Sequence, residues 1–315
     1  MKAFYCDNFV LPLPAAHSFP MAKYARLHER IVVEGILRPE DLVVPRAARW
    51  DELAFVHTAE YLSAVASGTL SPEAQRRIGF PWSPAMVERA RRSVGASIEA
   101  SHAAIMDGAA ANLAGGTHHA FADGGAGYCV FNDVAVAARV LLEEGRASRV
   151  AVLDTDVHQG DGTALIFRDA PEVFTCSLHG ANNFPFTKQR SDLDIVFEDG
   201  TRDDEYLRRL GEALEAVVAH RPDVLFYVAG ADPYEHDRLG RLKLTITGLA
   251  ERDRLVFGTA VSRRIPVSVC MAGGYAPDVD AIASIHANTV REAQRALAMA
   301  KRRGVNGSGK ITKWP

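Results

Sequence analysis

The chain has 315 residues, 48% of them hydrophobic, so it can bury a large core as one big α/β domain or as two ordinary ones. Its formal net charge of -3, from 36 basic and 39 acidic residues, provides no field that would attract nucleic acid or an anionic membrane. The composition therefore excludes a disordered or fibrous chain and gives no sign of a polyanionic partner.

The predicted elements alternate between short β-rich runs and longer amphipathic segments. Expected strands cover 2–6, 110–114, 149–153, 173–178, 224–228 and 266–271, and expected helices cover 21–34, 58–67, 84–106, 131–145, 203–220, 246–263 and 276–303. This alternation predicts a mostly parallel sheet between layers of helices, in a single domain over residues 1–303. Residues 304–315 contain three glycines without periodicity, so we expect a flexible tail there.

The four cysteines, at positions 6, 129, 176 and 270, are far apart and form no Cys-x-x-Cys pair, so we expect no disulfide framework. The first residues lack the apolar core of a signal peptide, and no uncharged stretch is long enough to cross a bilayer. We therefore expect a cytoplasmic protein without a membrane partner. The oligomeric state stays open.

The richest chemistry follows the strand expected at 149–153. Asp154, Asp156 and His158 lie two residues apart, and such residues leave an extended segment in the same direction. The carboxyl end of a strand is also where open α/β folds build their sites, so these residues predict half of a catalytic zinc site. A competing interpretation is that the Asp-Gly pair at 161–162 is only a turn before a helix.

Polar groups follow three other expected strands: the pair His118 and His119, then Asp232, and then Tyr275 after two glycines. Each has an ordinary alternative, namely a surface loop for the histidines, a helix cap or Asp-Pro turn for Asp232, and a loop aromatic for Tyr275. Because the carboxyl ends of parallel strands share one edge, their occurrence at four strand ends predicts a common site.

Five sequence strings together carry a family resemblance: GGTHHA at 115–120, GYCVFND at 127–133, DTDVHQGDGT at 154–163, GADP at 230–233 and GGY at 273–275. They resemble the zinc-dependent histone deacetylase superfamily, which includes acetylpolyamine amidohydrolases and acetoin-utilisation proteins. The resemblance runs from about residue 17 to 300 and implies a three-layer arginase/deacetylase-like fold. Gln159 and the segments at 17–21 and 78–82 are more similar to the class IV and bacterial branch.

The resemblance implies that Asp156, His158 and Asp232 are the ligands of one zinc ion, with room for water and a substrate carbonyl. Iron(II) or cobalt suits the same ligands. The resemblance also implies a structural potassium ion. Its ligands would be the side chains of Asp154 and Ser177 and the carbonyls of Asp156, His158 and Leu178.

The resemblance also assigns roles in catalysis. His119 would act as general base and then general acid, and His118 as its electrostatic partner. Asp161 would hydrogen-bond His119, and Asp154 would hydrogen-bond His118. Tyr275 would donate its hydroxyl to the oxyanion that forms when water attacks the amide.

The implied reaction is hydrolysis of an N-acyl amide on a primary amine such as acyl-lysine. Gly127 and Tyr128 resemble one wall of a substrate tunnel, with Phe184 as the opposing aromatic and Phe186 as its rival. One alternative is an acetylpolyamine amidohydrolase, which should have acidic residues at the tunnel mouth, and another is a non-catalytic metal-binding or ligand-binding subunit. A ureohydrolase would need a second aspartate beside Asp232 at Asp-x-Asp spacing, which the sequence lacks. His57 is expected to be structural.

Overall fold

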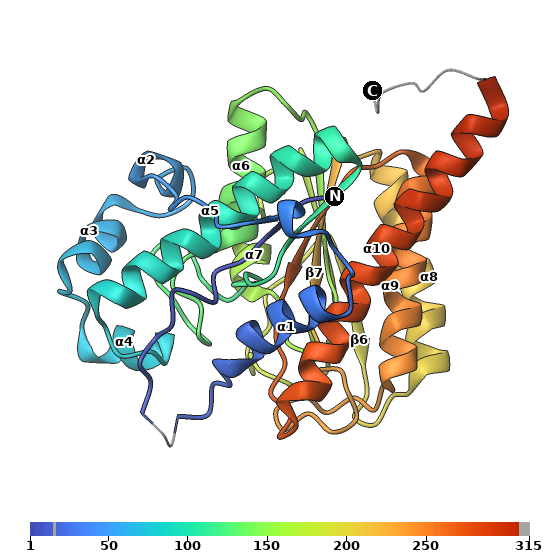
Figure 1. The fold of residues 1–315 in the computed structure, drawn as a ribbon. Coiled ribbons are helices and arrows are strands. Elements are labelled where there is room, and N and C mark those ends of the chain that lie inside the picture. Colours follow the sequence, from blue (N-terminus) through green and yellow to red (C-terminus); the bar gives the residue numbers. More distant parts are fainter. Residues whose placement is uncertain (15–16, 309–315) are drawn as a thin grey trace.

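The computed structural model describes residues 1–14 and 17–308, and the strands of this part form one parallel sheet (Figure 1). The strands are β1 (Ala3–Phe4), β2 (Leu42–Val43), β3 (Ala109–Asn112), β4 (Val150–Asp154), β5 (Val173–Gly180), β6 (Leu193–Phe197), β7 (Val224–Ala229) and β8 (Val267–Met271). Their order across the sheet is β2-β1-β3-β8-β7-β4-β5-β6. Strands β3, β8, β7 and β4 are therefore consecutive neighbours at the centre of the sheet.

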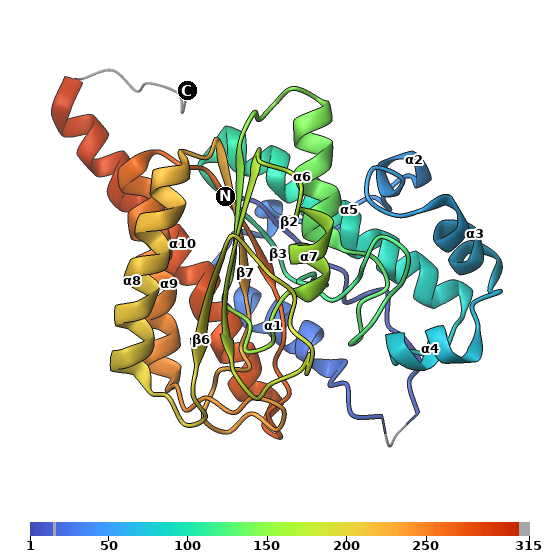
Figure 2. The same cartoon turned by 180° about the vertical axis from the view of Figure 1, so that it is seen from behind.

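Helices cover both faces of this sheet. They are α1 (Ala22–Val33), α2 (Trp50–Leu53), α3 (Ala59–Ser67), α4 (Pro72–Ile78), α5 (Pro84–Asp107), α6 (Asp133–Glu143), α7 (Asp161–Ile166), α8 (Asp203–His220), α9 (Ile246–Arg263) and α10 (Val279–Ser308), with a 3₁₀ turn at Pro39–Asp41. Viewed from behind, the strands stand between α8, α9 and α10 on one side and α5, α6 and α7 on the other (Figure 2). The fold is thus the three-layer α/β architecture expected from the strand-helix alternation.

Alternation along the central strands divides the core between the two faces. On β4, Val150 and Val152 pack with the core under α5 and α6, whereas Ala151 and Leu153 pack with the core under α8, α9 and α10. A strand buried on both faces reads as a continuous apolar run, which explains the sequences VAVLD of β4 and VLFYVA of β7. On β4 the one charged side chain, Asp154, therefore lies at the end of the strand.

Most expected elements occur where the sequence placed them. Helices α8 and α9 have the expected bounds, because each is an amphipathic segment with clear ends. Two strands, β2 and β6, and the short helices α2 and α4 were not expected. Helix α10 continues to Ser308, so 304–308 are helical where a tail was expected, and 309–315 lie outside the described residues.

The cysteine prediction is confirmed, since all four thiols are free and buried. Among the residues that the structure describes, no helix is both long enough and apolar enough to span a membrane.

Candidate active site

The polar motifs lie at the ends of four neighbouring strands. The segment after β3 carries His118 and His119, and the segment after β4 carries Asp156 and His158. Asp232 follows β7 between them. Tyr275 follows β8, so all these groups reach the same edge of the sheet.

Asp156, His158 and Asp232 form the group that could hold a metal ion. One ligand atom from each lies within 4.8 Å of the other two, and all three residues are buried. The Nδ1 atom of His158 is 2.9 Å from Oδ1 of Asp156 and 3.1 Å from Oδ2 of Asp232. The convergence predicted from the sequence is therefore present in the fold.

Main-chain N–H groups hold the second oxygen of each carboxylate. Gly273 N–H donates to Oδ2 of Asp156 at 2.8 Å, and Val157 N–H donates to Oδ1 of Asp232 at 2.9 Å. Each of these bonds joins two different strand ends. A Cβ atom on Gly273 would collide with the Asp232 carboxylate, so a residue without a side chain is required there.

The donor set suits a divalent cation such as zinc, because two carboxylates and one imidazole leave coordination positions open. Burial and the charge of Asp156 raise the pKa of Asp232 to about 7. Burial would lower the pKa of His158, but hydrogen bonds to Asp156 and Asp232 raise it to about 10. Without an ion the cluster therefore retains protons, which a bound metal would displace because its ligands must be deprotonated.

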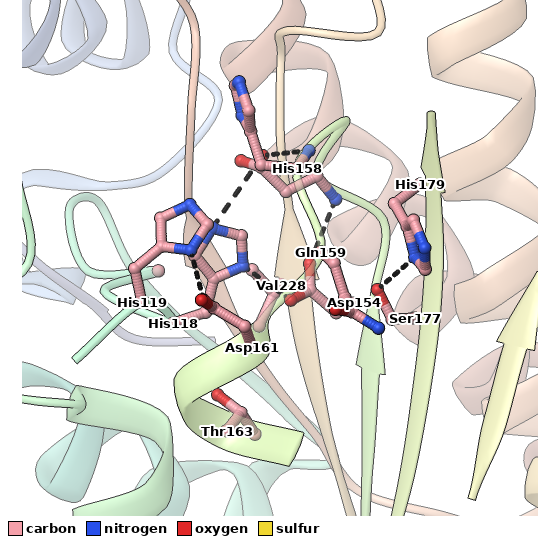
Figure 3. A network of polar contacts seen from close by, with 12 residues as sticks. His118, His119, Asp154, His158, Gln159, Asp161, Thr163, Ser177, His179 and Val228 are labelled. Carbon is pink, nitrogen blue, oxygen red and sulfur yellow. Dashed lines mark hydrogen bonds and ion pairs between the residues drawn. The ribbon is translucent and has the colours of Figure 1, made fainter. Parts of the chain in front are cut away.

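Asp154 does not belong to this cluster. Strand β4 ends at Asp154 and residues 156–158 form a bend, so the alternation expected to point all three side chains one way stops there. Oδ2 of Asp154 instead accepts a hydrogen bond from Nδ1 of His118 at 2.6 Å (Figure 3). Its other oxygen accepts the N–H of Asp156 at 3.1 Å.

The rings of His118 and His119 contact each other at a tilt, and each has its own carboxylate partner. Their ring centroids are 4.2 Å apart, and Nδ1 of His119 donates to Asp161 at 2.6 Å (Figure 3). Because each Nδ1 is fixed by a carboxylate, each Nε2 is left for the cavity. This arrangement matches the carboxylate partners that the family resemblance implied.

The two rings have opposite pKa shifts. Burial would lower the pKa of His118, but the charges of Asp154 and Asp156 outweigh it and raise the pKa to about 9. Burial lowers the pKa of His119 to about 4, and the positive charge of His118 acts in the same direction. Near neutral pH, His119 is thus the ring that can accept a proton, and His118 is the one that stabilises negative charge.

Asn132 and Asp133, at the start of α6, hold the loop that carries both histidines. Asn132 donates from its side chain to the carbonyl of Ala120 at 3.1 Å and caps α6 through its side-chain oxygen. The Asp133 carboxylate accepts the N–H and the hydroxyl of Thr117 at 2.7 and 2.6 Å. Both belong to the GYCVFND string, yet no role was predicted for either of them. The sequence signal for the role of Asn132 was its position directly before an apolar helical run, which is typical of a helix N-cap.

His57 supports the same loop through two hydrogen bonds. Its Nδ1 donates to the carbonyl of Phe121 at 3.0 Å, and its Nε2 accepts the N–H of Asn132 at 3.1 Å. Both bonds are made by the neutral ring, and burial lowers the pKa of His57 to about 4. This placement agrees with the structural role expected for His57.

Tyr275 is held through its main chain by two residues that sequence reasoning missed. The Asp237 carboxylate accepts the N–H of Tyr275 at 2.6 Å, and Nε of Arg238 donates to its carbonyl at 2.8 Å. Buried Lys23, on α1, donates to the carbonyl of Ala272 just before this segment at 3.2 Å. Neither Asp237 nor Arg238 lies in a motif, so nothing in the sequence marked them.

A cavity of about 40 Å³, enough for more than one water molecule, lies at this edge of the sheet. The site residues that line it are His118, His119, Asp156, His158, Tyr275, Gly127 and Tyr128. Two of the three possible metal ligands, Asp156 and His158, and the candidate catalytic groups His118, His119 and Tyr275 thus open into one space.

The two aromatic candidates for the tunnel wall lie in different places. The ring of Phe184 packs edge-on against His119 with centroids 4.9 Å apart, and a Cβ atom on Gly127 would lie 3.4 Å from it. Phe186 is 85% exposed, whereas Phe184 is 37% exposed. Only Phe184 therefore lies beside the candidate catalytic groups.

Two of the residues assigned to potassium, Ser177 and Leu178, lie on β5, the strand next to β4. Asp154 and Ser177 are register partners on β4 and β5, and Ser177 Oγ is 3.0 Å from Nδ1 of His179 (Figure 3). Leu178 is the next residue of β5. The potassium ion remains a prediction.

Comparisons with known proteins identify the family of the chain. The family model described as "Histone deacetylase domain" matches residues 17–292. Histone deacetylase 2 of Arabidopsis thaliana is 31% identical over 85% of this chain and 72% of its own length. Acetoin utilization protein AcuC of Bacillus subtilis is 35% identical over 76% of this chain and 67% of its own length.

Solved structures show the same fold. An HDAC homologue complexed with SAHA superposes with a TM-score of 0.79 at 24% identity, over 95% of this chain and 88% of its own. An HDAC homologue from Aquifex aeolicus gives 0.78 at 22% identity, over 99% and 92%. The matched domain covers most of the sequence and contains every group described above. The chain therefore belongs to the histone deacetylase family and is a hydrolase that acts on amide bonds.

Proposed function

We propose that this hydrolase uses zinc to remove acetyl or another short acyl group from acyl-lysine in proteins or peptides. The observation that carries the proposal is the cavity that two of the possible metal ligands, Asp156 and His158, line together with His118, His119 and Tyr275. A site that only bound metal would need neither a proton acceptor nor an oxyanion donor. We take residues 1–303 as one catalytic domain, in keeping with the single sheet.

Asp156, His158 and Asp232 would hold the ion, which when bound supplies Lewis acidity and lowers the pKa of water. His119 would take the proton of the attacking water at Nε2, because Asp161 fixes the proton on Nδ1. It would then return that proton to the leaving amine. The pKa shift of His119 supports this order, since a neutral ring must accept before it donates.

Tyr275 would donate its hydroxyl to the oxyanion, and the charge of His118 would stabilise the same transition state. Burial and the nearby carboxylates Asp156 and Asp232 raise the pKa of the Tyr275 phenol, so it stays a proton donor. The main-chain bonds from Asp237 and Arg238 would keep the ring in place.

The mouth of the site favours acyl-lysine over an acylated polyamine. A polyamine carries further ammonium groups that need carboxylates at the entrance. Two loops, 181–188 and 237–240, form this mouth, and Lys188 and Arg238 place cationic groups in them. The Asp237 carboxylate is already occupied by the N–H groups of Tyr275, Leu239 and Gly240. The Phe184 ring and the Gly127 backbone also lie close together beside His119, where an aromatic ring could flank a methylene chain.

Parallel assays test the proposal. The zinc-loaded protein should hydrolyse acetyl-lysine peptides with a higher kcat/KM than acetylspermidine or acetylputrescine. Preference for the polyamines would replace the substrate class, and turnover of neither would refute both.

Tyr275→Phe separates catalysis from metal binding. It should lower kcat by roughly 100-fold to 1,000-fold, since it removes one oxyanion donor, while zinc content measured by elemental analysis stays unchanged. Equal loss of zinc and activity would instead assign Tyr275 a structural role and favour the non-catalytic interpretation.

A further inference from the structure

The loop 181–188 between β5 and β6 has no regular structure, yet it carries the aromatic ring that lies beside His119. One side chain of the loop, that of Lys188, hydrogen-bonds to main-chain carbonyls of the same loop. Nζ of Lys188 donates to the carbonyls of Asn183 and Pro185 at 2.6 Å each and to that of Ala181 at 3.3 Å. These carbonyls flank Phe184 on both sides in the sequence, so the ammonium group fixes the backbone around that residue.

A second contact ties the loop to the neighbouring mouth segment. The buried side chain of Asn183 donates through Nδ2 to the carbonyl of Leu239 at 2.7 Å. Leu239 lies in the turn that Asp237 closes by accepting the N–H groups of Leu239 and Gly240. The Phe184 backbone is therefore held from within by Lys188 and from outside by the turn at 237–240.

These contacts define the position of the Phe184 ring but not that of the Phe186 ring. Phe184 meets the His119 ring at an interplanar angle of 76° and approaches the Gly127 backbone, whereas Phe186 points into solvent. Carbonyl oxygens of three residues gathered around one point repel each other unless a cation lies among them. Without the Lys188 ammonium, this backbone conformation would lose its main internal support.

We propose that Lys188 is a positioning residue that fixes Phe184 as one wall of the substrate tunnel, and so sets the affinity for the methylene chain of the substrate. This inference rests on the proposed function, because it takes the chain of acyl-lysine as the group that passes Phe184. A wall held in place before binding avoids the entropy cost of ordering it during binding. Lys188 thereby affects binding of the methylene chain of the substrate, whereas other residues act on the scissile amide.

Two hydroxamates of different length can distinguish binding at the metal site from binding along Phe184. Acetohydroxamate presents a metal-binding group without a chain, and octanohydroxamate adds a chain long enough to pass Phe184. Titration calorimetry on zinc-loaded protein should show that K188M weakens octanohydroxamate roughly 10-fold and changes acetohydroxamate less than twofold. The ratio of the two dissociation constants removes any change in metal content.

A double-mutant cycle tests whether Lys188 acts through Phe184. F184A should also weaken only octanohydroxamate, and K188M should add nothing in the F184A background. K188R, which keeps several N–H donors, should recover most of the affinity. The matched control is K243M, because Lys243 donates to one carbonyl, that of Glu235, and should leave both ligands unchanged.

Three results would overturn the inference: equal weakening of both hydroxamates by K188M, full additivity of K188M with F184A, or no effect of K188M. K188Q takes the same tests if K188M does not fold. Failure of the proposed function looks different, since the wild-type protein would then hydrolyse no acetyl-lysine peptide, whether or not it binds the two hydroxamates.

Discussion

The floor and the mouth of this site are built in different ways. The floor consists of Asp156, His158, Asp232, His118 and His119, at the ends of the central strands, and each of these residues is at most 8% exposed. The mouth consists of the loops 181–188 and 237–240, whose aromatic and apolar tips are partly or largely exposed. Charged groups paired with each other hold the floor, whereas side chains that donate to loop carbonyls hold the mouth.

The difference predicts how each region responds to change. Removing one partner from a buried charged network leaves the other without compensation, which costs several kcal/mol and disrupts the chemistry. Removing an exposed aromatic or its support changes only a binding surface. Floor substitutions should therefore abolish function, and mouth substitutions should adjust affinity.

The largest effect is expected from Asp232→Asn in the floor. The amide lacks the negative charge that a divalent ion requires, so bound zinc should fall from one equivalent to near zero. Turnover should fall on the order of a thousandfold, because a zinc ion held here would supply several kcal/mol of transition-state stabilisation. Elemental analysis checks the metal. Asp237→Asn, five residues later in the same segment, is the matched control and should keep its zinc, and equal loss from both would contradict the ligand assignment.

His57, which supports the loop that carries the two floor histidines, should make the free energy of unfolding sensitive to pH. The unfolded chain protonates an ordinary histidine near pH 6.5, but folded His57 resists a proton until about pH 4. Between these values the unfolded state binds more protons, so the free energy of unfolding rises with pH and is lost as the pH falls. The loss amounts to about 3 kcal/mol from this group.

His57→Gln removes that titration and keeps an amide donor and acceptor. The variant should be less stable at pH 7, and its deficit should shrink by about 3 kcal/mol as the pH falls to 4. Denaturant unfolding at several pH values measures both curves. Parallel curves for the two proteins would show that His57 takes up no proton on unfolding.

Asp237 lies at the boundary of floor and mouth, so Asp237→Asn should have an intermediate effect on turnover. Loss of the charge weakens the bond to the Tyr275 N–H, so the hydroxyl is less well placed and kcat should fall roughly 10-fold with KM nearly unchanged. In a Tyr275→Phe background the same change should have almost no further effect. Glu235→Gln, in the same loop, is the control. An equal loss in both backgrounds would separate Asp237 from Tyr275.

The floor was predictable from sequence because its physics is local. Apolar runs of five or six residues mark the central strands, and polar residues directly after them must reach the same edge of a parallel sheet. That reasoning brought Asp156, His158 and Asp232 together correctly, but it also grouped Asp154 with them. The error arose because β4 ends at Asp154, and the bend that follows turns the next side chains elsewhere.

The mouth could not be predicted in the same way. Lys188 and Asp237 contact main-chain groups of loops, and such contacts depend on backbone conformation that no periodic pattern records. The two-residue strands β1 and β2 are likewise too short for alternation to define, and the sequence placed β1 only as part of a longer run. The choice between Phe184 and Phe186 therefore required the fold.

The smallest effect is expected from Phe186→Ala, with Phe184→Ala as its matched partner two residues away. Phe186 is 85% exposed and its removal should change KM for an acetyl-lysine peptide less than twofold. Phe184→Ala should raise KM roughly 10-fold, because its ring lies against His119 and Gly127. Steady-state kinetics on one peptide measures both. If Phe186→Ala has the larger effect, the exposed ring contacts substrate outside the tunnel, and the mouth would then select its substrates by their surface rather than by the acylated chain.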